Sequence, residues 1–422
     1  MTSELDTWLA RLEQQHPRSV DLGLDRIRAV HTRLGLTKPA PVVITVGGTN
    51  GKGSTVAFIE AIARAQGLRV GAYTSPHLLH YNERIRIDGH DADDASIVEA
   101  FEAIEAARGD TTLTYFEVGT LAALWLFERA DLDLAILEVG LGGRLDATNL
   151  IDADVAVITT VDIDHTDWLG PDVESIGFEK AGIARAWTPL ILGDDDPPSS
   201  VLRHAYGIGA KALRIGCDFF FDPQADADTW QWRAVGEQYE LPRPSLAAPS
   251  QLRNAAVAIA ALRSSPLDIG ERAIADGVAN ARIAGRLQRI ERNGVDYVVD
   301  VAHNPQAARE LAAWLSRTPS PGRTIALFAA LGDKDAAGVV EALAPSVDAW
   351  NIAGLAGHGP RAVDVATFAG RLAGTAAATA TRWDDVASAI HGIDAHPGDR
   401  VLVFGSFHTV ADALHALGAT GR

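Results

Sequence analysis

The sequence predicts an α/β fold: a doubly wound, mostly parallel sheet domain followed by a smaller Rossmann-like α/β domain. Short apolar runs alternate with turns rich in Gly, Asp, Ser or His, and then with helical patterns. The runs are continuously apolar, as in parallel strands that helices cover on both faces. The chain also has 422 residues, more than one core ordinarily holds, so two domains are expected.

The first domain takes its strands from four apolar runs, at 41–46, 69–74, 134–139 and 155–161. A helix is expected to begin near Thr55. The strand-helix rhythm weakens between 194 and 249, where prolines and aromatic residues favour short antiparallel strands or an insertion. A helical pattern then resumes at about 251–263.

The second domain begins after Gly285, where the strand-helix rhythm restarts. Its expected strands lie at 297–301, 324–330, 350–353 and 401–404. The sequence therefore predicts an N-terminal domain at 1–285 and a C-terminal domain at 286–422, the latter of ordinary domain size.

Composition excludes several classes of protein. A net charge of −18 argues against a nucleic-acid binder, because phosphate backbones attract basic faces. The single cysteine, Cys217, excludes an intramolecular disulfide and fits a reducing compartment. The N-terminus, with Glu4 and Asp6, lacks the pattern of a secretory signal, and no run reaches the ~18 apolar residues of a membrane span. A cytoplasmic protein without membrane partners is expected.

The loop 47–54 follows an expected strand and opens an expected helix. Backbone amides in such a loop, with the helix N-terminus, favour an anion, and Lys52 adds a positive charge. Its spacing departs from the general P-loop pattern, because the leading glycine, Gly47, stands one residue closer and Gly53 separates Lys52 from Ser54. A phosphate-binding loop is favoured over a glycine-rich turn without a ligand, which makes the first domain P-loop-containing.

Three polar residues, Ser75, Glu138 and His165, lie at the carboxyl ends of expected strands. In a doubly wound sheet these ends share the edge where ligands bind. Taken singly, each has a simpler interpretation: a loop cap, a buried carboxylate and a loop histidine. A carboxylate that ends an apolar strand must be paired or bound to a cation, and Mg²⁺ suits hydroxyl, carboxylate and phosphate oxygens. Histidine is a less usual ligand for that hard ion.

A second glycine-rich loop, at 137–149, makes a family resemblance specific. With the loop at 49–54, it resembles the signature of the folylpolyglutamate synthase/dihydrofolate synthase family, a branch of the Mur ligase superfamily. The resemblance explains the unusual P-loop spacing and covers nearly the whole chain in order. The further matching motifs are 74–78, 116–120, 164–165 with 169–170, 179–183, Gln251 with 254–255, 285–286, and Asp300 with 302–305.

The resemblance implies a reaction. In this family ATP phosphorylates a carboxylate, and the amino group of L-glutamate then attacks the acyl phosphate. The resemblance assigns ATP phosphates to Asn50, Gly51, Lys52 and Gly53. Two Mg²⁺ sites are expected, with a monovalent cation as a further candidate cofactor. The implied metal ligands are Ser54, Ser75, Glu138, His165 and Lys180.

Lys180 would ordinarily be read as a solvent-facing lysine on a helix. The family motif Glu-Lys-Ala-Gly-Ile instead marks a lysine that becomes carbamylated, which turns a cation into an anionic metal ligand. Because the amine must lose a proton before it reacts with carbon dioxide, this implies a depressed pKa. Lys52, Lys180 and His165 are the expected catalytic residues. By resemblance, Asn254, Arg286 and Asp300 contact ATP, with His303 close by. The alternative for Arg286 is a surface arginine at a domain junction.

A pterin site is implied near the N-terminus, at 21–26, where the alternative is a polar helix start with a capping residue. Phe116 and Thr120 lie one helical turn apart and so can face one ligand. The residues that the resemblance assigns to dihydropteroate are Gly23, Leu24, Asp25, Arg26, Phe116, Glu117, Thr120, Leu145, Asp146 and Ala147.

The expected enzyme is a monomer that adds L-glutamate to dihydropteroate and to tetrahydrofolate polyglutamates in folate biosynthesis. A folylpolyglutamate synthase without the first activity and another Mur-type ligase are the alternatives. A cell-wall Mur ligase is disfavoured, because only 46 residues precede Gly47, too few for its nucleotide-sugar domain. A P-loop switch is disfavoured because no coiled coil is visible.

Overall fold

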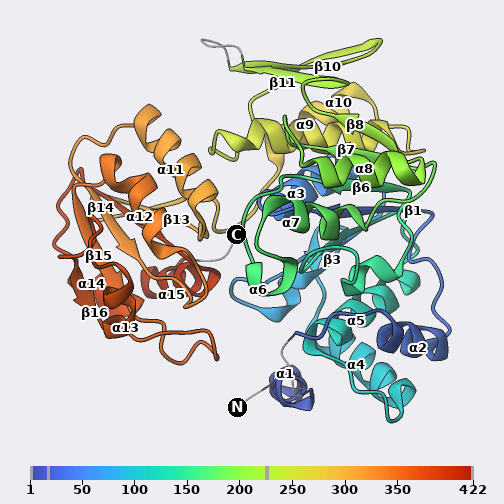
Figure 1. The fold of residues 1–422 in the computed structure, drawn as a ribbon, viewed down its shortest axis with the longest axis horizontal. Coiled ribbons are helices and arrows are strands. Elements are labelled where there is room, and N and C mark those ends of the chain that lie inside the picture. The colour runs from blue at the N-terminus through green and yellow to red at the C-terminus, as the bar shows by residue number, and fades with distance from the viewer. Residues whose placement is uncertain (1–2, 17–19, 224–227, 420–422) are drawn as a thin grey trace. The chain divides into compact units, whose positions relative to one another are not determined.

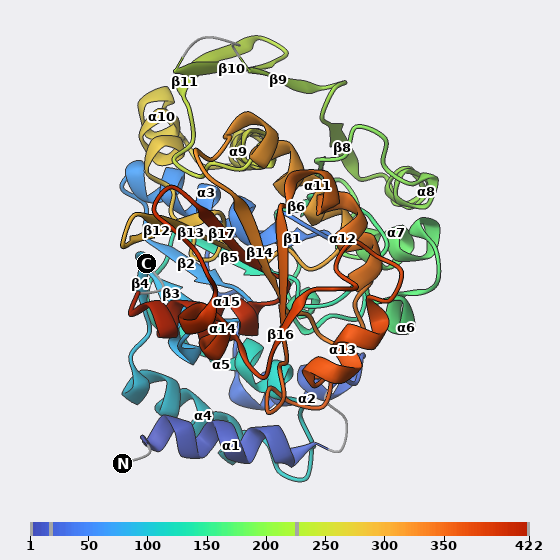
Figure 2. The ribbon, with the colours of Figure 1, turned by 90° about the vertical axis from the view of Figure 1, so that its left-hand side faces the viewer.

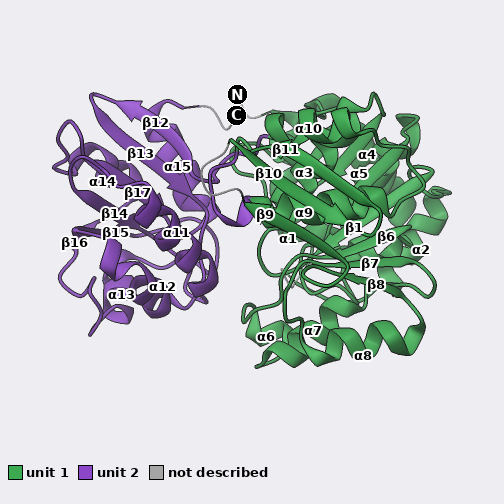
Figure 3. Cartoon of the chain, turned by 90° about the horizontal axis from the view of Figure 1, so that it is seen from above, with its two compact units in different colours: residues 1–245, 252–281 green, residues 246–251, 282–422 purple. Residues whose placement is uncertain are grey.

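A computed structural model describes residues 3–16, 20–223 and 228–419. The chain forms two compact units (Figure 3). Unit 1 comprises Met1–Ser245 and Leu252–Ala281, and unit 2 comprises Leu246–Gln251 and Arg282–Arg422. Residues 246–251 thus group with the later part of the chain. The predicted domains, 1–285 and 286–422, have different boundaries from these units and stay a prediction.

Unit 1 is built on an eight-stranded sheet with the order β4-β3-β2-β5-β1-β6-β7-β8. The six strands from β2 to β8 are parallel, whereas β3 and β4 pair antiparallel at one edge. The central strands are fully buried, as their continuous apolar runs predicted. The strands are β1 (Val42–Gly47), β2 (Val70–Tyr73), β3 (Ile85–Ile87), β4 (His90–Asp91), β5 (Leu134–Glu138), β6 (Val155–Ile158), β7 (Pro189–Leu192) and β8 (Lys211–Arg214).

Helices cover both faces of this sheet (Figure 1). On one face, one apolar cluster joins the sheet to α1, α2, α4 and α5, and another joins β6 and β7 to α7 and α8. On the other face, α3 contacts β1, β2 and β5. The helices are α1 (Glu4–Gln15), α2 (Asp25–Leu34), α3 (Lys52–Ala65), η1 (Tyr81–Arg84), α4 (Asp94–Arg108), α5 (Tyr115–Arg129), η2 (Ala147–Leu150), α6 (Thr166–Leu169), α7 (Val173–Ala181), α8 (Ser199–Ile208), α9 (Ser250–Arg263) and α10 (Glu271–Asn280).

Helix α3 begins at Lys52, three residues before the expected start near Thr55. The expectation was wrong because glycine is a poor helix former, so the apolar pattern is visible only after Gly53. Helix α10 packs against α3 on the side that faces away from the sheet. A Cβ on Gly277 would lie 2.4 Å from the Cα of Ile62, so only glycine permits this close approach.

The region 194–249 contains more than the expected antiparallel strands. It first completes another parallel unit, because β7, α8 and β8 extend the main sheet. A separate antiparallel sheet follows, and Trp232 Nε1 donates to the Ala256 carbonyl of α9 at 3.1 Å. Figures 1 and 2 show this sheet beside α9 and α10. Its strands are β9 (Phe219–Pro223), β10 (Thr229–Ala234) and β11 (Glu237–Pro242).

Unit 2 is built on a six-stranded sheet with the order β12-β13-β17-β14-β15-β16, in which only β12 is antiparallel. Phe328 stacks on Phe404 at the centre of its core. The elements are β12 (Gln288–Arg292), β13 (Val295–Asp300), α11 (Pro305–Arg317), β14 (Thr324–Phe328), α12 (Ala336–Leu343), η3 (Ala344–Ser346), β15 (Ala349–Ala353), α13 (Val365–Arg371), β16 (Thr381–Trp383), α14 (Val386–Gly392), β17 (Arg400–Phe404) and α15 (Phe407–Leu417).

Across the described ranges, none of the helices combines the length and the apolar character that crossing a membrane demands.

Candidate active site

The loop between β1 and α3 has a backbone that only glycine tolerates at two positions. Gly48 has φ +144°, and a Cβ there would lie 1.9 Å from Thr159 Oγ1. Gly51 has φ +87°, and a Cβ there would lie 2.6 Å from Asn254 Oδ1. The loop therefore lies close against two other segments, and Gly51 directly precedes the first turn of α3. This is the cradle geometry that places backbone amides and a helix N-terminus around an anion.

The segment directly after β6 holds the loop in place, and neither of its threonines was among the predicted site residues. Thr159 Oγ1 donates to the Asn50 carbonyl at 2.6 Å, and Thr160 Oγ1 accepts from the Asn50 amide at 3.1 Å. Thr49 N donates to the Thr160 carbonyl at 2.7 Å. Two threonines inside the expected strand 155–161, near its end, were the available signal, because their hydroxyls can bond a neighbouring backbone.

Two of the predicted catalytic residues, Lys52 and Lys180, meet at this loop. Lys52 Nζ donates to the carbonyls of Gly48 at 3.0 Å and Thr49 at 3.2 Å. Lys180 Nζ, from α7, donates to the same Gly48 carbonyl at 3.0 Å. The amines of two residues that lie 128 positions apart in the chain therefore donate to the same oxygen, the Gly48 carbonyl.

Lys180 is buried, so the interpretation as a solvent-facing lysine is wrong. Its residue surface is 4% exposed. Burial and the neighbouring charge of Lys52 lower the pKa of Lys180 to about 7, against the opposing effect of Asp164 and Asp146. A substantial fraction of this amine is therefore neutral near pH 7, the form that reacts with carbon dioxide.

The predicted metal ligands lie on neighbouring strands of the same sheet. Ser75 follows β2, and Glu138 is the last residue of β5, which pairs with β2. The Ser75 amide donates to Glu138 Oε2 at 3.1 Å, so these two residues do meet. Ser54 is buried in the first turn of α3. His165, with φ +53°, precedes α6, and its side chain is 33% exposed.

The side chains at this site can hold Mg²⁺ only when a bound ligand supplies further oxygen atoms. Within residues 3–16, 20–223 and 228–419, no three His, Cys, Asp or Glu side chains gather as a metal-binding group. Glu138 is nevertheless buried at the end of an apolar strand, where a carboxylate requires compensation. Hydroxyls, one carboxylate and phosphate oxygens are the ligands that Mg²⁺ takes beside a nucleotide.

Three of the predicted pterin residues, Phe116, Glu117 and Thr120, lie in the first turns of α5. Thr120 Oγ1 donates to the Phe116 carbonyl at 2.9 Å and lies 3.4 Å from the Tyr73 hydroxyl. The rings of Phe116 and Tyr73 are 5.9 Å apart, and a Cβ on Gly140 would lie 2.6 Å from the Phe116 ring. Tyr73, whose pKa burial raises to about 12, was not predicted, because it lies inside an apolar strand.

The first turn of α2 reaches the same helix. Arg26 donates to Glu117 Oε1 at 3.2 Å and pairs with Asp21 at 2.8 Å. Glu117 also closes a capping box with Thr114 at the start of α5. The alternative of a capped polar helix start is wrong, because the N-cap residue is Leu24, which makes no side-chain cap bond. Asp25 is exposed, whereas Gly23 and Leu24 are partly buried.

Asp146 organises the loop after β5. Its buried carboxylate accepts from the amides of Gly140 at 3.1 Å and Leu141 at 2.9 Å, and from the amide and hydroxyl of Thr148. Leu145 is partly buried and Ala147 is buried beside it. Asp146 thus fixes the glycine against which Phe116 packs.

In unit 2, Asp300 shapes the turn that carries Arg286. Its carboxylate accepts from the Leu287 amide at 2.9 Å and from the Ala302 amide at 2.8 Å. Burial raises the pKa of Asp300, while Arg286 acts to lower it. The Arg286 guanidinium lies 5.7 Å from the centre of the Phe407 ring, and His303 Nδ1 lies 3.0 Å from the Val301 carbonyl.

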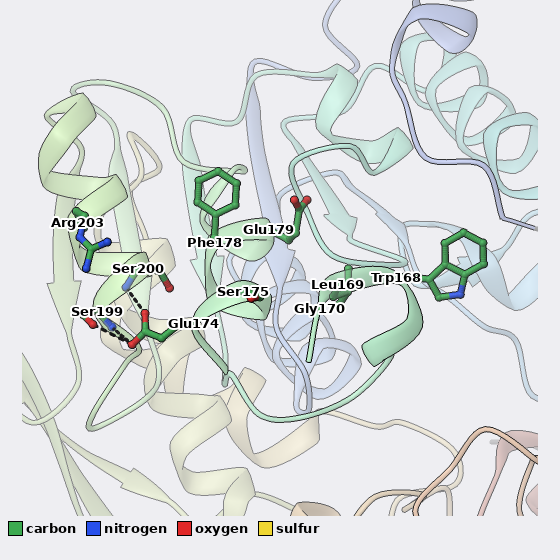
Figure 4. Close-up of a pocket in the computed structure, with 10 residues that line it drawn as sticks. All are labelled: Trp168, Leu169, Gly170, Glu174, Ser175, Phe178, Glu179, Ser199, Ser200 and Arg203. Atoms are coloured by element: carbon green, nitrogen blue, oxygen red, sulfur yellow. Dashed lines mark hydrogen bonds between the residues drawn. The ribbon is translucent and has the colours of Figure 1, made fainter. Parts of the chain in front are cut away.

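A cavity of about 710 Å³ lies elsewhere in unit 1, beside α6, α7 and α8 (Figure 4). Glu174 fills the amide-rich start of α8, because it accepts from Ser199 N, Ser199 Oγ and Ser200 N. None of the predicted site residues lines this cavity. Its lining residues are Trp168, Leu169, Gly170, Glu174, Ser175, Phe178, Glu179, Ser199, Ser200 and Arg203.

Comparison with known proteins decides the family. The chain matches the Mur ligase middle domain at 46–262 and the Mur ligase, glutamate ligase domain at 285–407. It is 46% identical to the dihydrofolate synthase/folylpolyglutamate synthase of Escherichia coli, over 99% of this chain and 96% of that protein. The chain belongs to this family of Mur ligases. The membership confirms the resemblance, the fold class and the ligase class predicted from the sequence.

Solved structures of relatives agree with this Mur ligase assignment. E. coli FolC in complex with DHPP and ADP superposes with a TM-score of 0.91 and 46% identity, covering 99% of this chain and 98% of that one. A Yersinia pestis bifunctional folylpolyglutamate synthase/dihydrofolate synthase, complexed with AMPPNP and a Mn ion, superposes with a TM-score of 0.90 at 46% identity, covering 99% and 98%. Both of these relatives are nucleotide complexes.

Proposed function

We propose that this ligase joins L-glutamate to dihydropteroate, forming dihydrofolate, and adds further L-glutamate to tetrahydrofolate polyglutamates. The observation that carries the proposal is the full-length similarity to the bifunctional E. coli relative, together with the glycine cradle on which Lys52 and Lys180 converge. ATP, a divalent metal and small-molecule substrates enter the proposal through the complexes of its relatives.

The proposed chemistry has two steps. A carboxylate oxygen of the pteroate attacks the γ-phosphorus of ATP, the bond to the β-γ bridging oxygen breaks, and ADP leaves. The glutamate amine, having lost a proton, then attacks the acyl carbon, and phosphate leaves with one oxygen of the original carboxylate. The protein contributes position and charge, which are the main requirements of phosphoryl transfer.

The nucleotide loop binds and orients the phosphates in this scheme. We assign the amides of Gly51 and Gly53 to the anion, and Asn50, whose amide donates to Thr160 Oγ1, to the phosphates through its side chain. Lys52 turns from the Gly48 and Thr49 carbonyls toward the transferred group. Asn254 supports Gly51, against which its side chain lies. We assign further ATP contacts to Arg286 and Asp300 in unit 2.

Two divalent ions, when bound, would neutralise charge on the transferring phosphoryl group. Ser54, Ser75 and Glu138 form one proposed ligand set. His165 and carbamylated Lys180 form the other, because a lysine near pKa 7 can exchange its cationic amine for an anionic carbamate. A monovalent cation is a further part of the same proposal.

The pterin site is proposed at the α5 surface. Phe116 offers a ring, and Thr120 and Glu117 offer polar atoms beside it. Arg26 holds Gly23, Leu24 and Asp25 near this helix through its pair with Glu117. Leu145, Asp146 and Ala147 complete the proposed site on the neighbouring loop.

The proposal is tested by ADP release from the purified chain with ATP and Mg²⁺. Release is expected only when both L-glutamate and a pterin acid are present, with dihydropteroate and with tetrahydrofolate. Release with tetrahydrofolate alone would leave a folylpolyglutamate synthase without the first activity. Release without L-glutamate would contradict any ligase. We further propose a cytoplasmic monomer, for which sedimentation should give one chain mass at every concentration.

A further inference from the structure

Arg86, on β3, makes a set of contacts that no proposed binding role explains. Its Nε and Nη2 donate to the Glu60 carboxylate, at 3.0 and 2.7 Å. Its Nη1 donates to Thr74 Oγ1 at 3.0 Å and to the Glu83 carbonyl at 3.1 Å. One guanidinium therefore bonds three separate segments of unit 1.

The first of these segments is the nucleotide helix. Glu60 lies on α3, about two turns after Lys52 and Ser54. The pair is nearly enclosed, with side-chain exposures of 16% for Arg86 and 9% for Glu60. A planar fork that bonds a carboxylate through two nitrogens fixes direction as well as distance.

The second segment is the turn after β2. Thr74 N donates to the Arg84 carbonyl at 2.9 Å, and Thr74 Oγ1 to the Glu83 carbonyl at 3.3 Å. Thr74 directly precedes Ser75, whose amide bonds Glu138. A bonded path thus runs from α3 through Glu60, Arg86 and Thr74 to Ser75 and Glu138.

Several carboxylates compensate the buried charge of Arg86. Burial acts to lower the pKa of Arg86, but the charges of Glu60, Asp91 and Glu138 raise it above its usual value. Apolar side chains of similar volume commonly replace buried ion pairs without loss of stability, so such a pair is weak evidence of a purely stabilising role. Its geometry, which joins the two segments that carry Ser54 and Ser75, indicates a positioning role.

We propose that Arg86, through Glu60 and Thr74, is a positioning residue that sets the spacing between Ser54 on α3 and Ser75 beside Glu138. The inference rests on the proposed function, since it takes these three residues as ligands of the divalent cation. In this proposal, the Arg86–Glu60 ion pair sets the geometry of the cation site although it contacts neither the cation nor the nucleotide.

The test measures cation binding rather than turnover. Calorimetry on the full chain gives the affinity for Mn²⁺ with saturating AMPPNP, and separately the affinity for AMPPNP without metal. Arg86→Lys keeps the charge but lacks the planar fork that bonds Glu60 through two nitrogens while a third nitrogen bonds Thr74. Loss of an outer support should weaken Mn²⁺ binding about tenfold or more, with metal-free AMPPNP binding unchanged. The double variant Glu60→Gln/Arg86→Met, which leaves no buried charge unpaired, should weaken it similarly.

Arg263→Lys is the matched control. Arg263 also forks onto a glutamate in unit 1, Glu237, at 2.9 and 2.6 Å, but that pair joins α9 to β11. This variant should bind Mn²⁺ like the unmodified chain, even where its melting temperature falls. Equal weakening in Arg263→Lys would show that the effect is general destabilisation and would overturn the inference.

Two further outcomes are decisive. Mn²⁺ binding that is unchanged in both Arg86→Lys and the double variant, or tighter in the double variant, would overturn the positioning role. The ligands themselves are tested by Ser75→Ala and Glu138→Gln in the same titration. Unchanged binding in those two variants contradicts the proposed ligand set, whereas unchanged binding in the Arg86 variants alone contradicts only the positioning role.

Discussion

At the scale of single residues, Lys180 is the most informative position. Its motif could be read from the sequence, but its environment could not. An isolated lysine on a short helix is ordinarily exposed. Here α7 packs so that the amine reaches the Gly48 carbonyl across the sheet edge, beside Lys52. Burial next to a like charge is what lowers its pKa, and only the folded chain creates that environment.

Replacing this amine should nearly abolish ligation. Lys180→Ala removes the proposed anionic ligand, and loss of cation support worth ~3 kcal/mol lowers kcat by about 100-fold. Added acetate or propionate should restore part of the rate by supplying a carboxylate. Lys211→Ala, which alters an exposed lysine of β8, is the control and should retain full activity. Steady-state ADP release measures all three, and full activity of Lys180→Ala would refute the assignment.

The pH dependence of carbamylation follows from the sign of the pKa shift. The folded pKa is about 7 and the ordinary value 10.5, so the folded amine becomes neutral as pH rises through about 7. Between these values the unfolded state holds a proton that the folded state lacks, and the Lys180 contribution to the free energy of unfolding therefore rises with pH. NMR with ¹³C-labelled bicarbonate should show a carbamate, absent from Lys180→Ala, whose yield per dissolved carbon dioxide rises through about pH 7. A rise only near the ordinary lysine value would contradict the shift.

At the scale of elements, the β1–α3 loop depends on close packing as well as on glycine conformation. Gly51 lies against Asn254 of α9, and Gly48 lies against Thr159 after β6. Three elements thus fix one loop. A helix N-terminus held in this way presents its amides without further ordering when an anion arrives.

A matched pair of glycines separates conformation from contact. Gly51 and Gly67 have φ of +87° and +88°, yet a Cβ on Gly67 would meet no atom within 4 Å. Alanine at either position should cost ~1–2 kcal/mol of backbone strain. Only Gly51→Ala also displaces Asn254, so it should weaken ATP binding about tenfold or more, equivalent to ~1.4 kcal/mol, while Gly67→Ala leaves it unchanged. Calorimetric titration with AMPPNP compares them, and equal affinities would contradict the cradle geometry.

The sequence predicted most elements near the site and missed others for physical reasons. Continuous apolar runs identified the buried central strands, whose ends carry Ser75 and Glu138. Strand β8 escaped notice because it lies at the sheet edge with only partial burial, so its pattern is not continuously apolar. The Arg86–Glu60 pair was invisible for another reason. Its residues lie 26 positions apart and meet only through the pairing of β2 with β3 and the packing of α3.

At the scale of the whole molecule, the two units contribute different parts of the proposed reaction. Unit 1 holds the nucleotide loop, the proposed cation ligands and the proposed pterin residues, while unit 2 holds Arg286 and Asp300 on a turn fixed by buried hydrogen bonds. The family match extends across both, from the middle domain to the glutamate ligase domain. The proposed reaction therefore involves the complete chain, with both units contributing to one ligation.

One measurement tests that claim most directly. Dihydropteroate labelled with ¹⁸O in its carboxylate is incubated with the full chain, ATP, Mg²⁺ and L-glutamate. The masses of the pterin product and of the released phosphate are then measured by mass spectrometry. The account predicts dihydrofolate, and inorganic phosphate that carries one ¹⁸O atom from the substrate carboxylate. Unlabelled phosphate, or ADP release with no glutamylated product, would contradict it.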